Sequence, residues 1–114
     1  MTNLRRLQSW YAAQCNGEWE HHHGVSIQSC DNPGWWVRID IEGTPLEHKS
    51  FIPVEHNVSL KEMEQIAAGL KSDACDRGSD WMLCRVKEKV FDGAGGPEKL
   101  EAMLGVFLTW AEEK

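Results

Sequence analysis

The stretch CNGEWEHHHG at residues 15–24 gathers the residue types of metal sites and of acid–base catalysis. Adjacent residues on a strand point to opposite faces, so His21 and His22 do not easily reach one ion there. A helical HxxxH pair is absent from the sequence. The other candidate zinc ligands stand at no diagnostic spacing: Cys15, His48, His56 and Cys84. We expect His21–His23 to flank the start of a strand, and a histidine-based metal-binding module stays an alternative.

A cysteine nucleophile is the second chemical possibility. Cys15 lies close to Glu20 and His21 in the sequence, near the end of a predicted helix. A helix C-terminus carries partial negative charge, which disfavours a thiolate at Cys15. Cys84 alternates with apolar residues and is typical of a small hydrophobic core residue. A small enzyme that uses Cys15, Glu20 and His21 remains an alternative, provided the fold brings the three side chains within hydrogen-bond reach.

Two pairs of carboxylates stand two residues apart: Glu18 with Glu20, and Asp40 with Glu42. On a strand such residues share a face, so each pair concentrates negative charge. Acid–base catalysis would also need a pocket and a shifted pKa. We favour a solvated face, and the same geometry would serve an acidic docking surface.

The glycine-rich GAGG at 93–96 precedes a predicted helix, as phosphate-binding loops do. It matches neither GxxxxGK[ST] nor GxGxxG. We interpret it as a flexible entry to the final helix and expect no cofactor.

The bulk composition indicates one domain over residues 1–114, because 114 residues with 41% hydrophobic content suffice for a single core. The net charge of −6 disfavours a nucleic acid partner. No apolar run approaches membrane-spanning length, so we expect no membrane partner. Four cysteines without a CxxC pattern indicate reduced thiols and a cytoplasmic location. The oligomeric state stays open.

The first half of the chain alternates between helical and strand patterns. Residues 4–14 have helical spacing, with Asn3 as the expected N-cap and Asn16-Gly17 as the stop. Residues 24–30 and 35–41 alternate with period two and predict a hairpin, with a type II turn across 32–35. Residues 42–45 give a second turn signal. A third strand is expected within residues 46–55, with Pro53 at an edge or bulge.

The second half predicts a helix over 60–72, where Ser59 and Glu62 form a capping box, followed by a loop at 76–80. Residues 81–91 predict a fourth strand. The final helix has Pro97 in its first turn and a clear apolar stripe: Leu100, Met103, Leu104, Phe107, Leu108 and Ala111. The expected fold is α+β, an antiparallel meander of about four strands with N-terminal, middle and C-terminal helices packed mainly on one face.

Four segments together resemble the bacterial immunity protein 53 family: LQSWYAAQCNGEWEH, DNPGWWVRID, DWMLCRV and GGPEKLEAMLGVFLTWA. The resemblance runs from about Leu4 to Ala111. It implies a protein without enzymatic activity that binds and neutralises a cognate toxin, often a nuclease. The family's motif falls on Gln8, Trp10, Tyr11, Cys15, Gly17, Trp19, Glu20, His21, Asp31, Asn32, Pro33, Gly34, Trp35, Asp40, Gly96 and Pro97.

A partner-binding surface follows from this resemblance together with the charge and tryptophan content. Buried aromatic anchors dominate interface energies, and acidic surfaces suit basic partners. The predicted surface comprises Trp19, Glu20, Trp36, Asp40 and Glu42. Trp36 is the preferred anchor, because it alternates away from Val37, Ile39 and Ile41. The predicted core includes the remaining tryptophans: Trp10, Trp35, Trp81 and Trp110.

Overall fold

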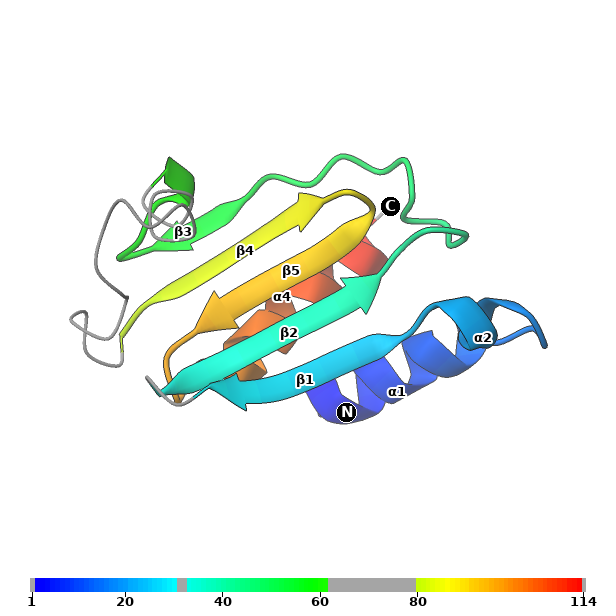
Figure 1. The fold of residues 1–114 in the computed structure, drawn as a ribbon, viewed down its shortest axis with the longest axis horizontal. Helices are drawn as coiled ribbons and strands as arrows, with labels where there is room; N and C mark the ends of the chain where they lie inside the picture. The colour runs from blue at the N-terminus through cyan, green and yellow to red at the C-terminus, as the bar shows by residue number, and fades with distance from the viewer. Residues whose placement is uncertain (1, 31–32, 62–79, 114) are drawn as a thin grey trace.

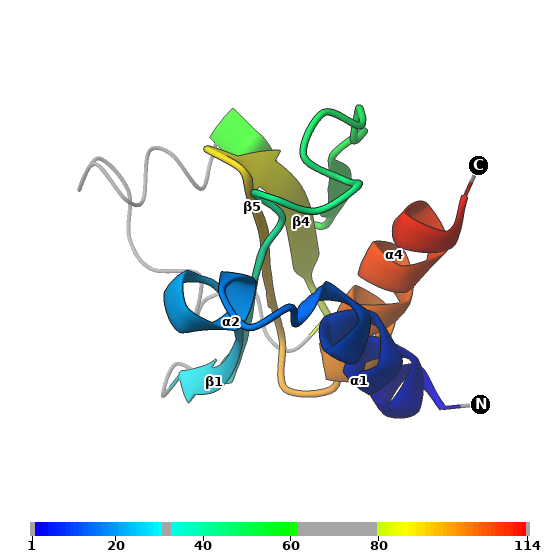
Figure 2. The same ribbon diagram turned by 90° about the vertical axis from the view of Figure 1, so that its right-hand side faces the viewer.

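A five-stranded antiparallel sheet is the main element of the computed structural model, which describes residues 2–30, 33–61 and 80–113. Its spatial order is β1-β2-β5-β4-β3. Two long helices lie side by side against one face of the sheet, as the face-on view (Figure 1) and the side view (Figure 2) show. The elements are α1 (Asn3–Gln14), α2 (Trp19–His22), β1 (Val25–Cys30), β2 (Gly34–Asp40), β3 (Val54–His56), β4 (Met82–Lys87), β5 (Val90–Gly95) and α4 (Leu100–Glu112).

The N-terminal helix α1 is confirmed, but its cap differs from the prediction. The Oγ1 of Thr2 accepts the backbone N–H of Arg5 at 3.2 Å, so Thr2 and not Asn3 is the N-cap. Asn3 instead donates its side-chain amide to the carbonyl of Glu101 in α4 at 3.2 Å. This contact and the packing of buried Leu7 hold α1 beside α4.

The predicted β1–β2 hairpin is confirmed, and part of its predicted type II turn lies outside the described residues. Val37, Ile39 and Ile41 are fully buried on the helix side, as the alternation predicts. The core between sheet and helices also contains Phe91 and Phe107, whose rings meet edge-to-face with centroids 5.2 Å apart.

The predicted third strand is largely wrong, because only Val54–His56 is a strand. Thr44 explains this: its hydroxyl donates to the carbonyl of Ile41 at 2.7 Å and accepts the N–H of Leu46 at 3.1 Å. These local bonds turn the chain after β2, and buried Leu46 fixes the turn to the core. The segment then runs along the top of Figure 1 to the far edge of the sheet.

The predicted fourth strand and the predicted glycine-rich loop are together a hairpin, β4 and β5. Glu88 and Lys89 have φ values of 53° and 62°, which are typical of a type I′ turn. Residues 93–95 therefore form the end of a central strand and not a flexible entry. Because β5 lies between β2 and β4, the sheet is not one continuous meander.

The C-terminal helix α4 confirms the predicted apolar stripe, with Met103, Leu104, Phe107, Leu108 and Trp110 buried. It begins at Leu100, so Pro97 stands in the turn before the helix and not in its first turn. At its other end, Lys49 donates from Nζ to the carbonyl of Trp110 at 2.5 Å, which satisfies a terminal carbonyl.

The predicted helix over 60–72 and the loop at 76–80 lie mostly outside the described residues. Leu60 and Lys61 have helical conformation, in agreement with the predicted helix start. Among the helices that the structure describes, none combines the length and the apolar content needed to span a membrane.

Candidate partner-binding face

The face of the sheet opposite α1 and α4 points toward the viewer in Figure 1. Strand register places alternate side chains of every strand on it. We call these residues the open face: Ser26, Gln28, Trp36, Arg38, Asp40, Val90, Asp92, Ala94, Leu83, Arg85, Lys87 and Glu55. At the β3–β4 end, Leu83 packs with Trp81 and Val58 in a small second core. The remainder of the open face carries polar and charged groups around Trp36.

Trp36 is the large aromatic side chain of the open face, and 42% of its surface is exposed. Its indole Nε1 donates to the Oδ1 of Asp92 at 2.7 Å. The guanidinium carbon of Arg38 lies 5.4 Å from the centre of its ring, within cation–π range. The ring is thus exposed and at the same time fixed in orientation by a hydrogen bond and a cation.

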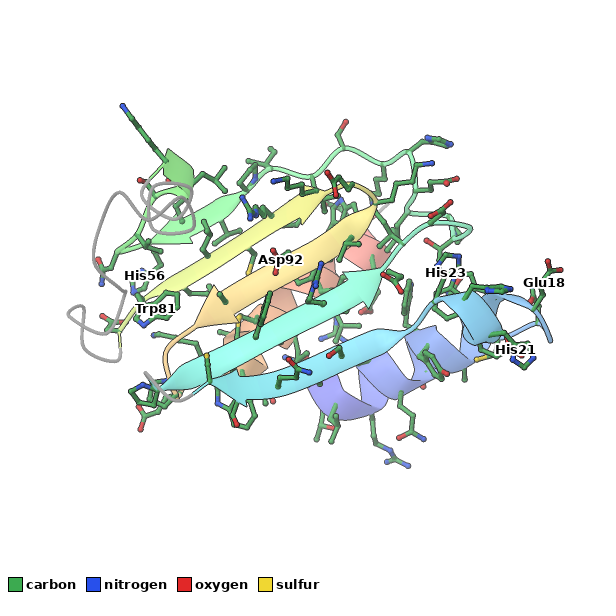
Figure 3. The ribbon with its side chains drawn as sticks, in the orientation of Figure 1. Glu18, His21, His23, His56, Trp81 and Asp92 are labelled. Carbon is green, nitrogen blue, oxygen red and sulfur yellow. The ribbon has the colours of Figure 1, made fainter. Side chains whose placement is uncertain are left out.

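Asp92 stands in the middle of the open face (Figure 3). Register places it directly between Arg38 of β2 and Arg85 of β4. Its Oδ2 lies 3.7 Å from the Nε of Arg85, in a pair whose side chains are about a quarter exposed. The sequence does not single out Asp92, because the predicted fourth strand ends at residue 91, one position before it. The period-two spacing of Val90, Asp92 and Ala94 is the signal that could have found it.

A shallow hollow of about 450 Å³ opens beside Trp36, between β1 and β2. Its lining is mixed in character: Gly24, Val25, Ser26, Gln28, Trp36, Arg38 and Asp40. Asp40 closes the hollow at the end near α2. There its Oδ2 accepts the backbone N–H of Gly24 at 2.9 Å and lies 3.9 Å from the Nδ1 of His23.

The structure places Trp19 inside the molecule, where it is 5% exposed. Its Nε1 donates to the backbone carbonyl of Glu42 at 2.8 Å, and its ring meets those of Trp10 and Tyr11 at centroid distances of 6.2 and 5.9 Å. Placing Trp19 on the contact surface was therefore wrong, because the short helix α2 turns this ring toward α1. Glu42 itself is exposed in the turn after β2.

Glu20 closes the loop between α1 and α2. Its two carboxylate oxygens accept the backbone N–H groups of Asn16 and Gly17 at 2.9 and 2.8 Å. The backbone N–H of Glu20 itself, and after it those of Asn16 and Gly17, hold the pKa of this carboxyl below its usual value. Gly17 has a φ of +91°, a left-handed conformation that glycine adopts without strain. Glu20 thus shapes the corner of the molecule next to the open face.

The structure gives little support to a catalytic site made of Cys15, Glu20 and His21. The Cys15 thiol donates to the carbonyl of Tyr11 at 3.4 Å, and its hydrogen bond to the Tyr11 phenol raises the pKa of that phenol. No hydrogen bond joins His21 to Cys15 in the described part of the chain. Glu20, with both oxygens occupied and a lowered pKa, is poorly suited to act as a general base.

The histidines do not converge on a common point. His21 and His22 belong to α2, and His23 is its C-cap, at the end of the molecule seen on the right of Figure 3. No group of three or more potential ligands that could hold a metal ion occurs among the described residues. Cys84 is fully buried, and burial raises its thiol pKa to about 12, as fits the expected small hydrophobic residue.

Several motif residues named above hold distant segments together. Trp35 of the DNPGW segment donates from Nε1 to the carbonyl of Pro97 in the GGP segment at 2.8 Å. The motif residue Trp19 donates its backbone N–H to the side-chain oxygen of Asn16 at 2.8 Å, which joins the first turn of α2 to the end of the preceding loop. Trp19, Trp35 and Pro97 thus hold the fold together, and Trp36, the next residue after Trp35 in β2, points to the exposed open face.

A second apolar surface lies on the helix side of the molecule. A groove of about 470 Å³ runs between α4 and the segment before β3, lined in part by Phe51, Val106 and Trp110. Ile52 stands at its rim and is 85% exposed. This groove lies away from the open face and provides the natural comparison for any binding experiment.

In a comparison with known proteins, residues 4–112 match the model of the immunity protein 53 family. No curated protein and no solved structure matches the chain. The matched range includes both helices of the packed layer and all five strands of the sheet. The chain therefore belongs to the immunity protein 53 family, and this membership implies a protein that gives immunity against a toxin.

Proposed function

We propose that this protein neutralises its toxin by direct contact, and that the open face is the surface that docks on the toxin's enzymatic domain. Trp36 is the central anchor of the proposed interface. Asp40 and Glu42, which the sequence already placed in the contact surface, form its rim. Trp19 and Glu20 act indirectly, because they hold the α2 corner beside that rim.

The exposure of Trp36 is the observation that carries this proposal. An indole with 42% of its surface exposed leaves a large apolar area in water, while its N–H is already satisfied by Asp92. Such a ring gains free energy when a partner covers it, and fixing its orientation in advance lowers the entropy lost on binding. Tryptophan and arginine, adjacent here, are the residue types enriched at interface hot spots.

The toxin is expected to be an enzyme domain such as a nuclease, and an inhibitor that binds it needs no active site of its own. Within the described residues the polar groups near Cys15 and Glu20 are engaged in local hydrogen bonds. This arrangement favours a binding protein over a small enzyme. A binding protein can use the surface of the sheet as its contact surface.

Co-purification tests the proposal directly. The protein is expressed without a tag, together with the tagged toxin domain encoded next to its gene. We expect the cells to survive and a one-to-one complex to elute from the affinity column. Survival without a complex would contradict direct binding and would favour indirect or catalytic protection. Cell death with both proteins present would contradict the immunity function against this toxin.

A further inference from the structure

We infer that Arg38, held over the ring of Trp36, receives a carboxylate side chain of the toxin. This inference rests on the proposed function and names the chemistry of the partner at the same surface. It reverses the sign expected from the sequence, where the net charge of −6 suggested an acidic surface that meets a basic partner.

Arg38 has no ion pair with any residue that the structure describes. Its direct neighbour across the strands is Asp92, but the oxygens of that carboxylate face Trp36 at 2.7 Å and Arg85 at 3.7 Å. One carboxylate therefore lies between two guanidinium groups, and its ion pair is with Arg85. The positive charge of Arg38 remains available to a partner.

The other carboxylates of the open face are engaged within the molecule. Asp40 accepts the backbone N–H of Gly24 at 2.9 Å, and Glu55 accepts that of Leu60 at 3.3 Å. Lys87, by contrast, has no ion pair in the described part of the chain. The charges of the open face without an internal ion pair or hydrogen bond are thus cationic, although the whole chain is acidic.

The hollow beside Trp36 fits an acidic side chain better than a basic one. Its lining offers the guanidinium of Arg38, the hydroxyl of Ser26 and the amide of Gln28 as donors. The carboxylate of the lining, Asp40, lies at one end and already accepts the backbone N–H of Gly24. A guanidinium binds a carboxylate through two parallel hydrogen bonds, and stacking on an indole leaves its N–H edge free to do so. The indole ring would cover the aliphatic part of the incoming Asp or Glu.

Charge reversal tests the inference. We expect Arg38→Glu to weaken binding of the neighbouring-gene toxin domain about 100-fold, because it sets two carboxylates against each other. Arg5→Glu is the matched control: it makes the same charge change on the exposed side of α1, behind the sheet. We expect the control to change the dissociation constant by about threefold or less. Circular dichroism and a urea titration of both variants verify folding.

Crosslinking identifies the group on the toxin. Arg38→Lys introduces a primary amine, which a zero-length carbodiimide reagent joins to a carboxylate in contact with it. We expect a new crosslink from position 38 to an Asp or Glu of the toxin, found by mass spectrometry of the complex. The same treatment of Arg5→Lys is expected to give no crosslink to the toxin.

The outcomes separate this inference from the proposed function. The inference alone is overturned by three results together. The wild-type protein forms the complex, Arg38→Glu binds the toxin domain as tightly as Arg5→Glu does, and Arg38→Lys gives no crosslink at position 38. A wild-type protein that does not bind the toxin domain overturns the proposed function and this inference with it. Strong loss for Arg38→Glu only, with the crosslink, supports both.

Discussion

At the scale of single residues, two tryptophans of similar chemistry have opposite positions. Trp19 is 5% exposed and donates to a backbone carbonyl in the interior of the α2 corner, whereas Trp36 is 42% exposed on the open face. Both indole N–H groups have a hydrogen-bond acceptor, which fixes the orientation of each ring. The first stabilises the fold, and the second is the anchor that we propose for the toxin.

Truncating the two rings is expected to affect stability unequally. Trp19→Ala should lower the free energy of unfolding by about 3–5 kcal/mol, because it leaves a cavity among Trp10 and Tyr11. Trp36→Ala should lower it by about 1 kcal/mol, since the lost groups are half exposed. Urea denaturation followed by circular dichroism measures both. Equal losses would contradict the assignment of one ring to the core and the other to the surface.

At the scale of elements, periodicity correctly predicted the N-terminal helix, the first hairpin and the C-terminal helix. The β4–β5 hairpin was missed because its turn residues, Glu88 and Lys89, are neither Gly nor Asn, although both adopt positive φ. Because that strand was missed, Asp92 was not recognised as the neighbour of Trp36 on the open face. Trp36 was placed correctly, because alternation within one strand fixes which face a residue occupies.

The glycines of β5 explain why the sequence of this strand is typical of a loop. A Cβ at Gly95 would stand 2.9 Å from the Cβ of Lys99 and 3.2 Å from the carbonyl oxygen of Trp81. The glycine allows the turn before α4 to lie close to the strand. Composition alone does not distinguish a glycine that gives flexibility from one that permits close packing.

Two glycines of the first hairpin test this packing argument. A Cβ at Gly34 would lie 2.4 Å from the backbone oxygen of Gly95, whereas a Cβ at Gly24 would have no neighbour within 4 Å. We expect Gly34→Ala to lower the free energy of unfolding by about 1–3 kcal/mol, because a backbone atom must move. Gly24→Ala should change it by about 0.5 kcal/mol or less. Urea titration of both variants measures these free energies. An unchanged free energy of unfolding for Gly34→Ala would contradict the close approach of β2 and β5.

At the scale of the whole molecule, exposed carboxylates join segments that are distant in sequence. Asp80 contacts Lys99 and His56, both at 2.8 Å, and so connects the starts of β4 and α4 with the end of β3. Glu47 pairs with Lys89 at 3.2 Å and connects the loop after β2 to the β4–β5 turn. Lys99 first, then His56, lowers the pKa of Asp80, and Lys89 lowers the pKa of Glu47.

These lowered pKa values predict loss of stability in acid. A carboxyl with a lower pKa in the folded state binds its proton more readily when unfolded, so its stabilisation is present above the unfolded pKa and is lost as pH falls through the folded one. The urea midpoint should therefore fall as pH decreases from about 5 to about 3. Asp80→Asn should reduce this dependence. Glu88→Gln is the control, since Glu88 has no ion pair or hydrogen bond from its side chain within the described residues. A midpoint that rises in acid would contradict these pKa directions.

The two-layer arrangement explains how a small chain presents a preformed surface. α1 and α4 lie on one face of the sheet, and the antiparallel pairing of β2 with β5 places Trp36 beside Asp92 on the other face. We propose that the open face is preformed for binding, which would lower the free-energy cost of forming the complex.

Isothermal titration calorimetry of this protein with its neighbouring-gene toxin domain tests the central claim most directly. We expect Trp36→Ala to weaken binding about 30-fold or more, the equivalent of about 2 kcal/mol for a central aromatic anchor. Ile52→Ala, which removes an exposed apolar side chain from the helix-side groove, should leave the dissociation constant unchanged. Unchanged binding of Trp36→Ala, with loss for Ile52→Ala, would contradict the account and place the interface on the helix side.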